Sequence, residues 1–131
     1  MASHPVPEGR DLLAHCCLFL QDKHVIDLRA YDVRSRSAIT DFYLVGSVRN
    51  DRQMKAAGQN LTRQLKKLGV RAMHKDGEIG SSWIVLDYVD CIVHLFTIEA
   101  RAHYDIESLW SGCELPLAVS YTHLRAHETP E

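Results

Sequence analysis

Two β-type runs, Trp83–Tyr88 and Cys91–Phe96, constrain this chain most strongly, because only Val89 and Asp90 separate them. So short a break between such runs predicts an antiparallel hairpin with a two-residue turn. Side chains alternate along a strand, so the residues of each face can be assigned from the sequence. One face is almost wholly apolar and is predicted to lie in the core. It comprises Ile84, Leu86, Tyr88, Cys91, Val93 and Leu95.

The opposite face of the hairpin mixes large apolar groups with a carboxylate and an imidazole. It comprises Trp83, Val85, Asp87, Ile92, His94 and Phe96. A face of that mixture is either half covered by a helix or offered to a partner.

Helical spacing of apolar residues predicts three helices, over residues 11–22, 50–68 and 98 to about 110. Asn50 and Thr97 are suited to cap the second and third, and Gly69 and Gly112 to end them. The buried stripe of the second helix is predicted to be Met54, Ala57, Gly58, Leu61, Leu65 and Leu68. In the third helix, Ala102, Ile106 and Leu109 are predicted to face inward.

Three further strands are predicted, over residues 25–33, 42–47 and 70–74. A strand–helix–strand unit favours a right-handed parallel crossover, so the strand over 70–74 is expected to return alongside the sheet. Together these elements predict a single α/β domain of the α+β type. It would have a mixed five-stranded sheet flanked by about three helices.

The chain has 131 residues, 46% of them hydrophobic and 24% charged, as expected of one compact domain. Residues 11–114 are predicted to form it. Residues 1–10 are predicted to be a loose leader. Residues 115–131 are predicted to be an unstructured tail, with 120–131 resembling a translated sequencing adapter and hence a gene-model artefact. The chain has no membrane-length apolar run or signal peptide, so a cytoplasmic protein is expected.

Charge is strongly polarised along the chain. Residues 49–75 hold eight Lys or Arg and a single acid, whereas residues 76–114 hold eight Asp or Glu and only Arg101. If these segments form separate surfaces, the acidic one would attract a basic partner and repel phosphate. Either segment could equally be solvated surface without a partner.

No catalytic constellation is apparent in the sequence. The four cysteines lack C-x-x-C spacing and are expected to be reduced and buried. A phosphate-binding G-x-x-x-x-G-K-[ST] loop is absent. Asp87 and Asp90 lie three apart across a turn, and no Asp-x-Asp or Asp-x-Glu comes after Gly46-Ser47. No enzyme activity, metal or cofactor is therefore predicted.

The segment WIVLDYVDCIVHLFTIEARAHYDIESLW closely resembles the signature of the ribosomal silencing factor (Iojap-like) family. DVRSRSAITDFYLV and NDRQMKAAGQNL resemble that family's other signature segments, in the same order, so the likeness covers about residues 12–112. The chain departs from the family pattern at Val89, where the family usually has Gly before the turn aspartate. A second departure is the run Ser47-Val48-Arg49-Asn50, which replaces a run of small residues.

The resemblance implies a fold like that of nucleotidyltransferases, but without a catalytic site. It also implies a translational repressor that binds the large ribosomal subunit through its protein L-fourteen and blocks joining of the small subunit. The candidate partner-binding residues are Trp83, Asp87, Tyr88, Asp90, His94, Phe96, Glu99, Arg101 and Tyr104. The alternative for Trp83 and Phe96 is ordinary core under a flanking helix. For Tyr88, the predicted register itself favours the core.

The sequence also leaves other functions and partners possible. The basic segment 49–75 is a candidate for a minor contact with ribosomal RNA. The runner-up functions are a metal-dependent nucleotidyltransferase and a dimeric scaffold for another protein, with the hairpin supplying an edge strand for self-association.

Overall fold

The predicted hairpin is present in the computed structural model, which describes residues 5–77 and 80–117. Strands β4 (Trp83–Asp87) and β5 (Cys91–Thr97) pair antiparallel in the predicted register, with Asp87 opposite Ile92 and Trp83 opposite Phe96. Val89 takes a positive φ of 72° in the turn, a conformation that glycine adopts more easily. The Asp87 carboxylate holds this turn by accepting a hydrogen bond from the Val89 amide over 2.8 Å.

Six strands form one sheet, in the order β3-β4-β5-β2-β1-β6. The other strands are β1 (Ile26–Asp32), β2 (Phe42–Val48), β3 (His74–Asp76) and β6 (Glu114–Leu115). Only the central pair, β2 and β5, is parallel among the strands of the described residues. The predicted mixed sheet of a single α+β domain is therefore confirmed, with one strand more than expected. The extra strand, β6, is only two residues long and carries little sequence pattern.

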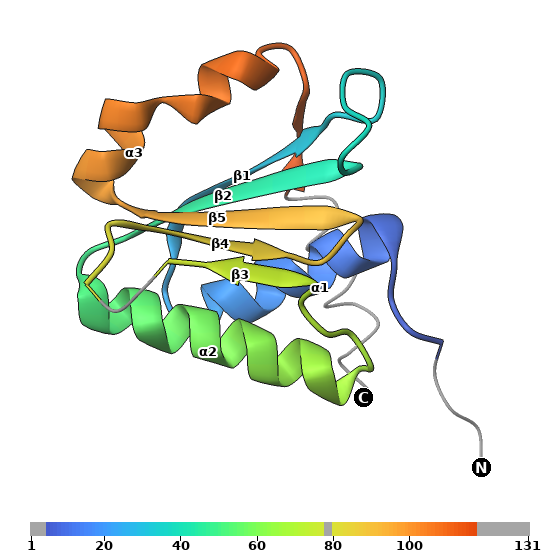
Figure 1. The fold of residues 1–131 in the computed structure, drawn as a ribbon, viewed down its shortest axis with the longest axis horizontal. Helices are drawn as coiled ribbons and strands as arrows, with labels where there is room; N and C mark the ends of the chain where they lie inside the picture. The colour runs from blue at the N-terminus through green and yellow to red at the C-terminus, as the bar shows by residue number, and fades with distance from the viewer. Residues whose placement is uncertain (1–4, 78–79, 118–131) are drawn as a thin grey trace.

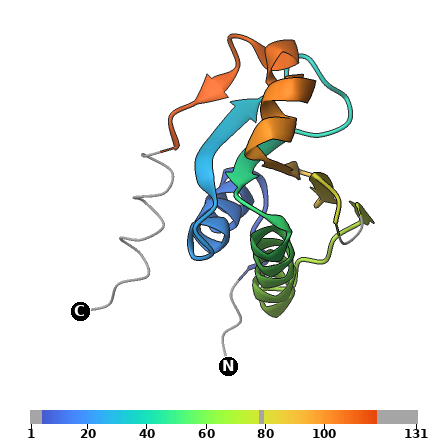
Figure 2. The ribbon, with the colours of Figure 1, turned by 90° about the vertical axis from the view of Figure 1, so that its left-hand side faces the viewer.

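Helices cover both faces of this sheet (Figure 1; Figure 2). Helices α1 (Gly9–Gln21) and α2 (Asp51–Lys67) pack side by side on one face. Helix α3 (Ile98–Tyr104) and the short 3₁₀ helix η1 (Ile106–Trp110) come after β5 and cross the other face. The Asn50 side chain caps α2 by accepting from the Gln53 amide over 2.8 Å, as predicted.

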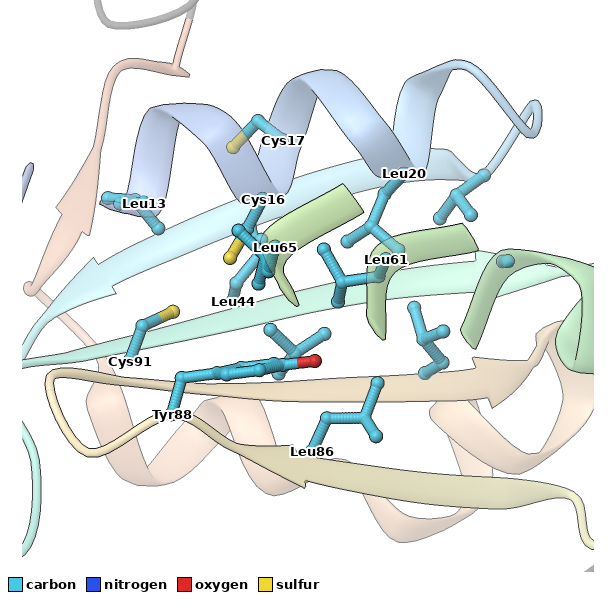
Figure 3. Packing of buried hydrophobic residues seen from close by; sticks show 14 of the residues in the cluster. Leu13, Cys16, Cys17, Leu20, Leu44, Leu61, Leu65, Leu86, Tyr88 and Cys91 are labelled. Atoms are coloured by element: carbon cyan, nitrogen blue, oxygen red, sulfur yellow. The ribbon is translucent and has the colours of Figure 1, made fainter. Parts of the chain in front are cut away.

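The main core lies between the sheet and the α1–α2 layer (Figure 3). It contains the predicted apolar hairpin face: Leu86, Tyr88, Cys91, Val93 and Leu95 are buried there, and the half-buried Ile84 packs against them. Helix α2 contributes its predicted stripe, except that Leu68 is half-buried. Three of the cysteines, Cys16, Cys17 and Cys91, are buried free thiols, as expected, and Cys113 is half-buried.

The third predicted strand is wrong in position. Residues 70–72 form no strand; the Val70 amide instead donates to the Leu65 carbonyl, closing the end of α2. The strand forms later, at His74–Asp76, and pairs antiparallel with β4 at the sheet edge. It therefore does not lie beside β2 as a simple crossover would place it, because the β4–β5 hairpin occupies that side.

The last helix is also shorter than predicted. Asp105 adopts a left-handed conformation (φ 46°, ψ 48°) that ends α3 and shifts the helical phase of residues 106–110. Within α3, Ala100 and Arg101 face the sheet and Ala102 is exposed; after the break, Ile106 is half-buried and Leu109 is exposed. Thr97 does cap this helix, accepting from the Ala100 amide over 3.3 Å.

No helix in the described part of the chain is long and apolar enough to cross a membrane. Helix α1 begins at Gly9, two residues earlier than predicted. The predicted tail is described only as far as Leu117, and its segment 120–131 lies outside the described residues.

Candidate functional site

A cluster of aromatic rings lies on the sheet face opposite α1 and α2. We call it the aromatic cluster. Its members are Tyr31, Tyr43, Trp83, His94, Phe96, Tyr104 and Trp110. Strand alternation places Tyr31, Tyr43, Trp83, His94 and Phe96 on this face, from four different strands. Helices α3 and η1 add Tyr104 and Trp110 from above.

Coverage of this face is uneven. Helix α3 packs on β5 and β2, and the Trp110 ring stacks on Tyr43 with centroids 4.0 Å apart. Over β4, by contrast, Trp83, Val85 and Asp87 stay half-exposed, and Tyr104 beside them is 50% exposed. We call Trp83, Val85, Asp87 and Tyr104 the open hairpin face. The hairpin face is thus half covered by a helix and half available to a partner.

His94 lies beneath this face and is 8% exposed. Its Nδ1 atom accepts a hydrogen bond from the Trp83 indole Nε1 over 3.1 Å. Because an indole N–H only donates, Nδ1 must be unprotonated and the neutral ring carries its proton on Nε2. Burial lowers the pKa of His94 to about 4, so the ring is neutral near pH 7.

Arg101 is a buried anchor rather than an exposed contact. Its guanidinium forms a fork with the Glu107 carboxylate, at 2.8 and 2.9 Å, and also donates to the Asp27 carbonyl and to Ser47 Oγ. Burial alone would raise the pKa of Glu107, but hydrogen bonds from Arg101 and Tyr31 bring it below its usual range. This pair ties η1 to α3 and to the sheet, and so fixes Tyr104 and Trp110 above it.

The remaining predicted site residues divide into buried and exposed groups. Phe96 is fully buried beneath Trp83, and Tyr88 lies on the other side of the sheet, in the main core. Asp90 binds the first turn of α1, because its Oδ2 accepts from the Gly9 amide over 2.9 Å. Glu99 is exposed on α3. Of the nine predicted residues, the structure therefore brings Trp83, Asp87 and Tyr104 to one accessible face.

Sequence reasoning missed four residues of this region: Tyr31, Tyr43, Glu107 and Trp110. Tyr43 was detectable, since it alternates with the core residues Phe42 and Leu44 on a predicted strand. Glu107 and Trp110 were assigned to a continuous helix, whose period does not predict their positions after the break at Asp105.

The acids of residues 76–114 do not form one surface. Glu107 pairs with Arg101, Glu114 pairs with Arg29 at 3.3 Å, and Asp90 holds α1. Asp87 is the acid that lies on the open hairpin face. Some carboxylates of the predicted acidic surface therefore form contacts within the fold instead of facing a partner.

The residues considered for nucleotidyl transfer have structural roles. A Cβ at Gly46 would lie 2.5 Å from Val25 Cγ1, so glycine here leaves room for the Val25 side chain. Ser47 Oγ accepts from Arg101. No cluster of three potential metal ligands occurs among residues 5–77 and 80–117.

These features define a single-domain α+β protein with a partly open aromatic sheet face. Residues 6–131 match the model of a family described as ribosomal silencing factor during starvation. The chain belongs to this ribosomal silencing factor family.

Individual relatives agree with this assignment. The chain is 35% identical over 85 residues to ribosomal silencing factor RsfS of Haemophilus influenzae, covering 65% of this chain and 83% of the relative. It is 29% identical over 94 residues to RsfS of Bacillus subtilis, covering 72% and 80%. A crystal structure of a Chromobacterium violaceum protein superposes with a TM-score of 0.78 at 25% identity, covering 84% of this chain and 92% of that one.

Proposed function

We propose that this protein is a translational silencer of the cytoplasm. It binds the large ribosomal subunit, chiefly through its protein L-fourteen, and sterically blocks joining of the small subunit. The observation that carries this proposal is the family match over residues 6–131. Its relatives are named ribosomal silencing factors, and the open hairpin face supplies a surface suited to docking.

The proposed mechanism requires that the protein bind the large subunit and occupy space there, and no covalent bond is made or broken. Trp83 and Tyr104 present aromatic area, the kind of side chain that dominates interface energies. Asp87 supplies negative charge beside them, which favours a basic ribosomal protein and orients its approach. A folded domain bound at the subunit interface would then exclude the small subunit by overlap.

The predicted contact residues take two roles under this proposal. Trp83, Asp87, Tyr104 and the nearby Glu99 would touch the partner. His94, Phe96 and Arg101 would hold the touching residues in place from below, whereas Tyr88 and Asp90 stabilise the fold.

Cosedimentation with purified ribosomal subunits tests the proposal. The parent protein should travel with large subunits and little with small ones. Asp87→Lys combined with Tyr104→Ala should weaken that association at least tenfold, because it reverses the charge and removes an exposed ring. Asp22→Lys, an exposed change at the C-terminal end of α1 on the opposite face of the sheet, is the charge-matched control and should bind as the parent does.

Two outcomes separate the parts of the proposal. If the parent does not travel with large subunits, the function is wrong. If the folded double variant binds as well as the parent, the function stands and the open hairpin face is not the interface. Two further hypotheses stay predictions from the sequence: that the basic segment 49–75 contacts ribosomal RNA, and that the protein forms a homodimer.

A further inference from the structure

A groove runs between α2 and the β3–β4 end of the sheet, on the face opposite the aromatic cluster. Its volume is about 450 Å³. The floor is formed by Met54 and Gly58 of α2 and by Ile84 and Leu86 of β4. Figure 2 shows the β3 end of the sheet extending past α2, and α2 packs on β2 and β5. Within the described residues, no further helix lies beyond α2 on this side of β4.

The rim of this groove is basic. Lys55, Arg63 and Lys66 line it from α2, and Lys75 lines it from β3. All four are exposed, and none has an ion-pair partner within residues 5–77 and 80–117. The structure thus gathers half of the eight cations of segment 49–75 around one apolar floor. Asp51 and Asp76 are the acids among the lining residues.

The shape of the groove indicates an elongated occupant. Its lining runs along one stripe of α2 from Asp51 to Lys66, a length of about 22 Å at 1.5 Å per residue. A helix of about 15 residues has this length. Helices α1 and α2 already lie side by side on this face, so another helix beside α2 would extend the same layer.

We propose that this groove binds an amphipathic helix of a partner protein, one with an apolar stripe flanked by Asp or Glu. The stripe would cover the half-buried Ile84, above the buried Met54 and Leu86, and the acids would face Lys55, Lys66 and Lys75. Single-stranded RNA fits less well, because no aromatic ring is among the described residues that line the groove and its floor is apolar. This site is separate from the open hairpin face and does not depend on the proposed ribosomal function.

The test uses the full chain, labelled with ¹⁵N, and a synthetic 16-residue helical peptide with Leu at helical spacing and Glu on its flanks. The peptide should shift the amide signals of residues 51–66 and 84–86, and its affinity should fall as salt rises. Lys55→Glu combined with Lys66→Glu should weaken binding at least tenfold. Arg52→Glu combined with Lys67→Glu makes the same charge change on α2 outside the groove lining and should bind as the parent does.

Several results would overturn the proposal. They are no shift at the groove, equal binding of a peptide with Lys in place of Glu, or equal loss in both double variants. An RNA 16-mer that shifts the same amides more strongly would identify RNA as the occupant. Signals at the groove that change with protein concentration alone would identify a second copy of the chain.

Discussion

The Trp83 indole donates to His94 Nδ1 over 3.1 Å, and this bond joins the half-exposed end of the hairpin to a buried imidazole. The bond requires an unprotonated Nδ1, which burial of His94 favours. Protonation of His94 would therefore place an uncompensated charge within the aromatic cluster and disturb the position of Trp83.

Stability should consequently depend on pH through His94. Its pKa is about 4 in the folded protein, against about 6.5 in an unfolded chain. Between these values the unfolded chain binds the extra proton, so the free energy of unfolding falls as pH drops, by about 3 kcal/mol in all. Urea unfolding at pH 7, 6 and 5 should show about 2 kcal/mol of this loss, since pH 5 is still above the folded pKa. His94→Phe should flatten the slope although it leaves the Trp83 N–H unpaired; an unchanged slope would refute the role given to His94.

Removing the buried ion pair of Arg101 and Glu107 should lower the stability of the fold. Arg101→Ala leaves the Glu107 carboxylate half-buried without its cation and should lower the free energy of unfolding by about 3 kcal/mol. Arg34→Ala breaks the exposed pair with Asp32 and serves as the control, with little effect expected. Thermal unfolding compares the two; equal midpoints would mean that Arg101 does not anchor η1.

The turn residue Val89 offers a stabilising change. A β-branched residue at φ 72° is strained, and Val89 is 50% exposed, so little burial is lost when it is removed. Val89→Gly should raise the free energy of unfolding by about 1 kcal/mol, which chemical denaturation can measure. A lower stability would show that the turn tolerates valine without strain.

Gly46 should be intolerant of any side chain. A Cβ there would lie 2.5 Å from Val25 Cγ1 and 2.9 Å from Leu28 Cδ2. Gly46→Ala should therefore cost about 1–3 kcal/mol through overpacking, measured by urea unfolding. The loss should appear without any ligand or metal, since it arises from packing alone. An alanine variant as stable as the parent would contradict the close approach of the Val25 and Leu28 side chains.

Much of the fold can be traced to local patterns in the sequence. The hairpin register, the caps at Asn50 and Thr97 and the buried stripe of α2 were predictable, because strand alternation and helical period act over a few residues. The break at Asp105 and the position of β3 were not. Both depend on contacts that no local pattern encodes: the fork of Arg101 and Glu107, and the pairing of His74 with Asp87.

The candidate site was predictable only in part. The family resemblance and the mixed hairpin face identified Trp83, Asp87 and Tyr104. They could not show that Tyr43 of β2 and Trp110 of η1 would cover His94, since these two rings meet only in the folded chain. Nor could a charge count show that Glu107 and Glu114 are paired within the fold.

Subunit joining is the most direct test of the central claim. Purified large subunits are incubated with the protein, small subunits are added, and the joined particle is measured by sucrose-gradient sedimentation. The protein should lower the amount of joined particle in proportion to its occupancy of large subunits, and Asp87→Lys with Tyr104→Ala should restore joining. An unchanged amount of joined particle at saturating protein would contradict the account.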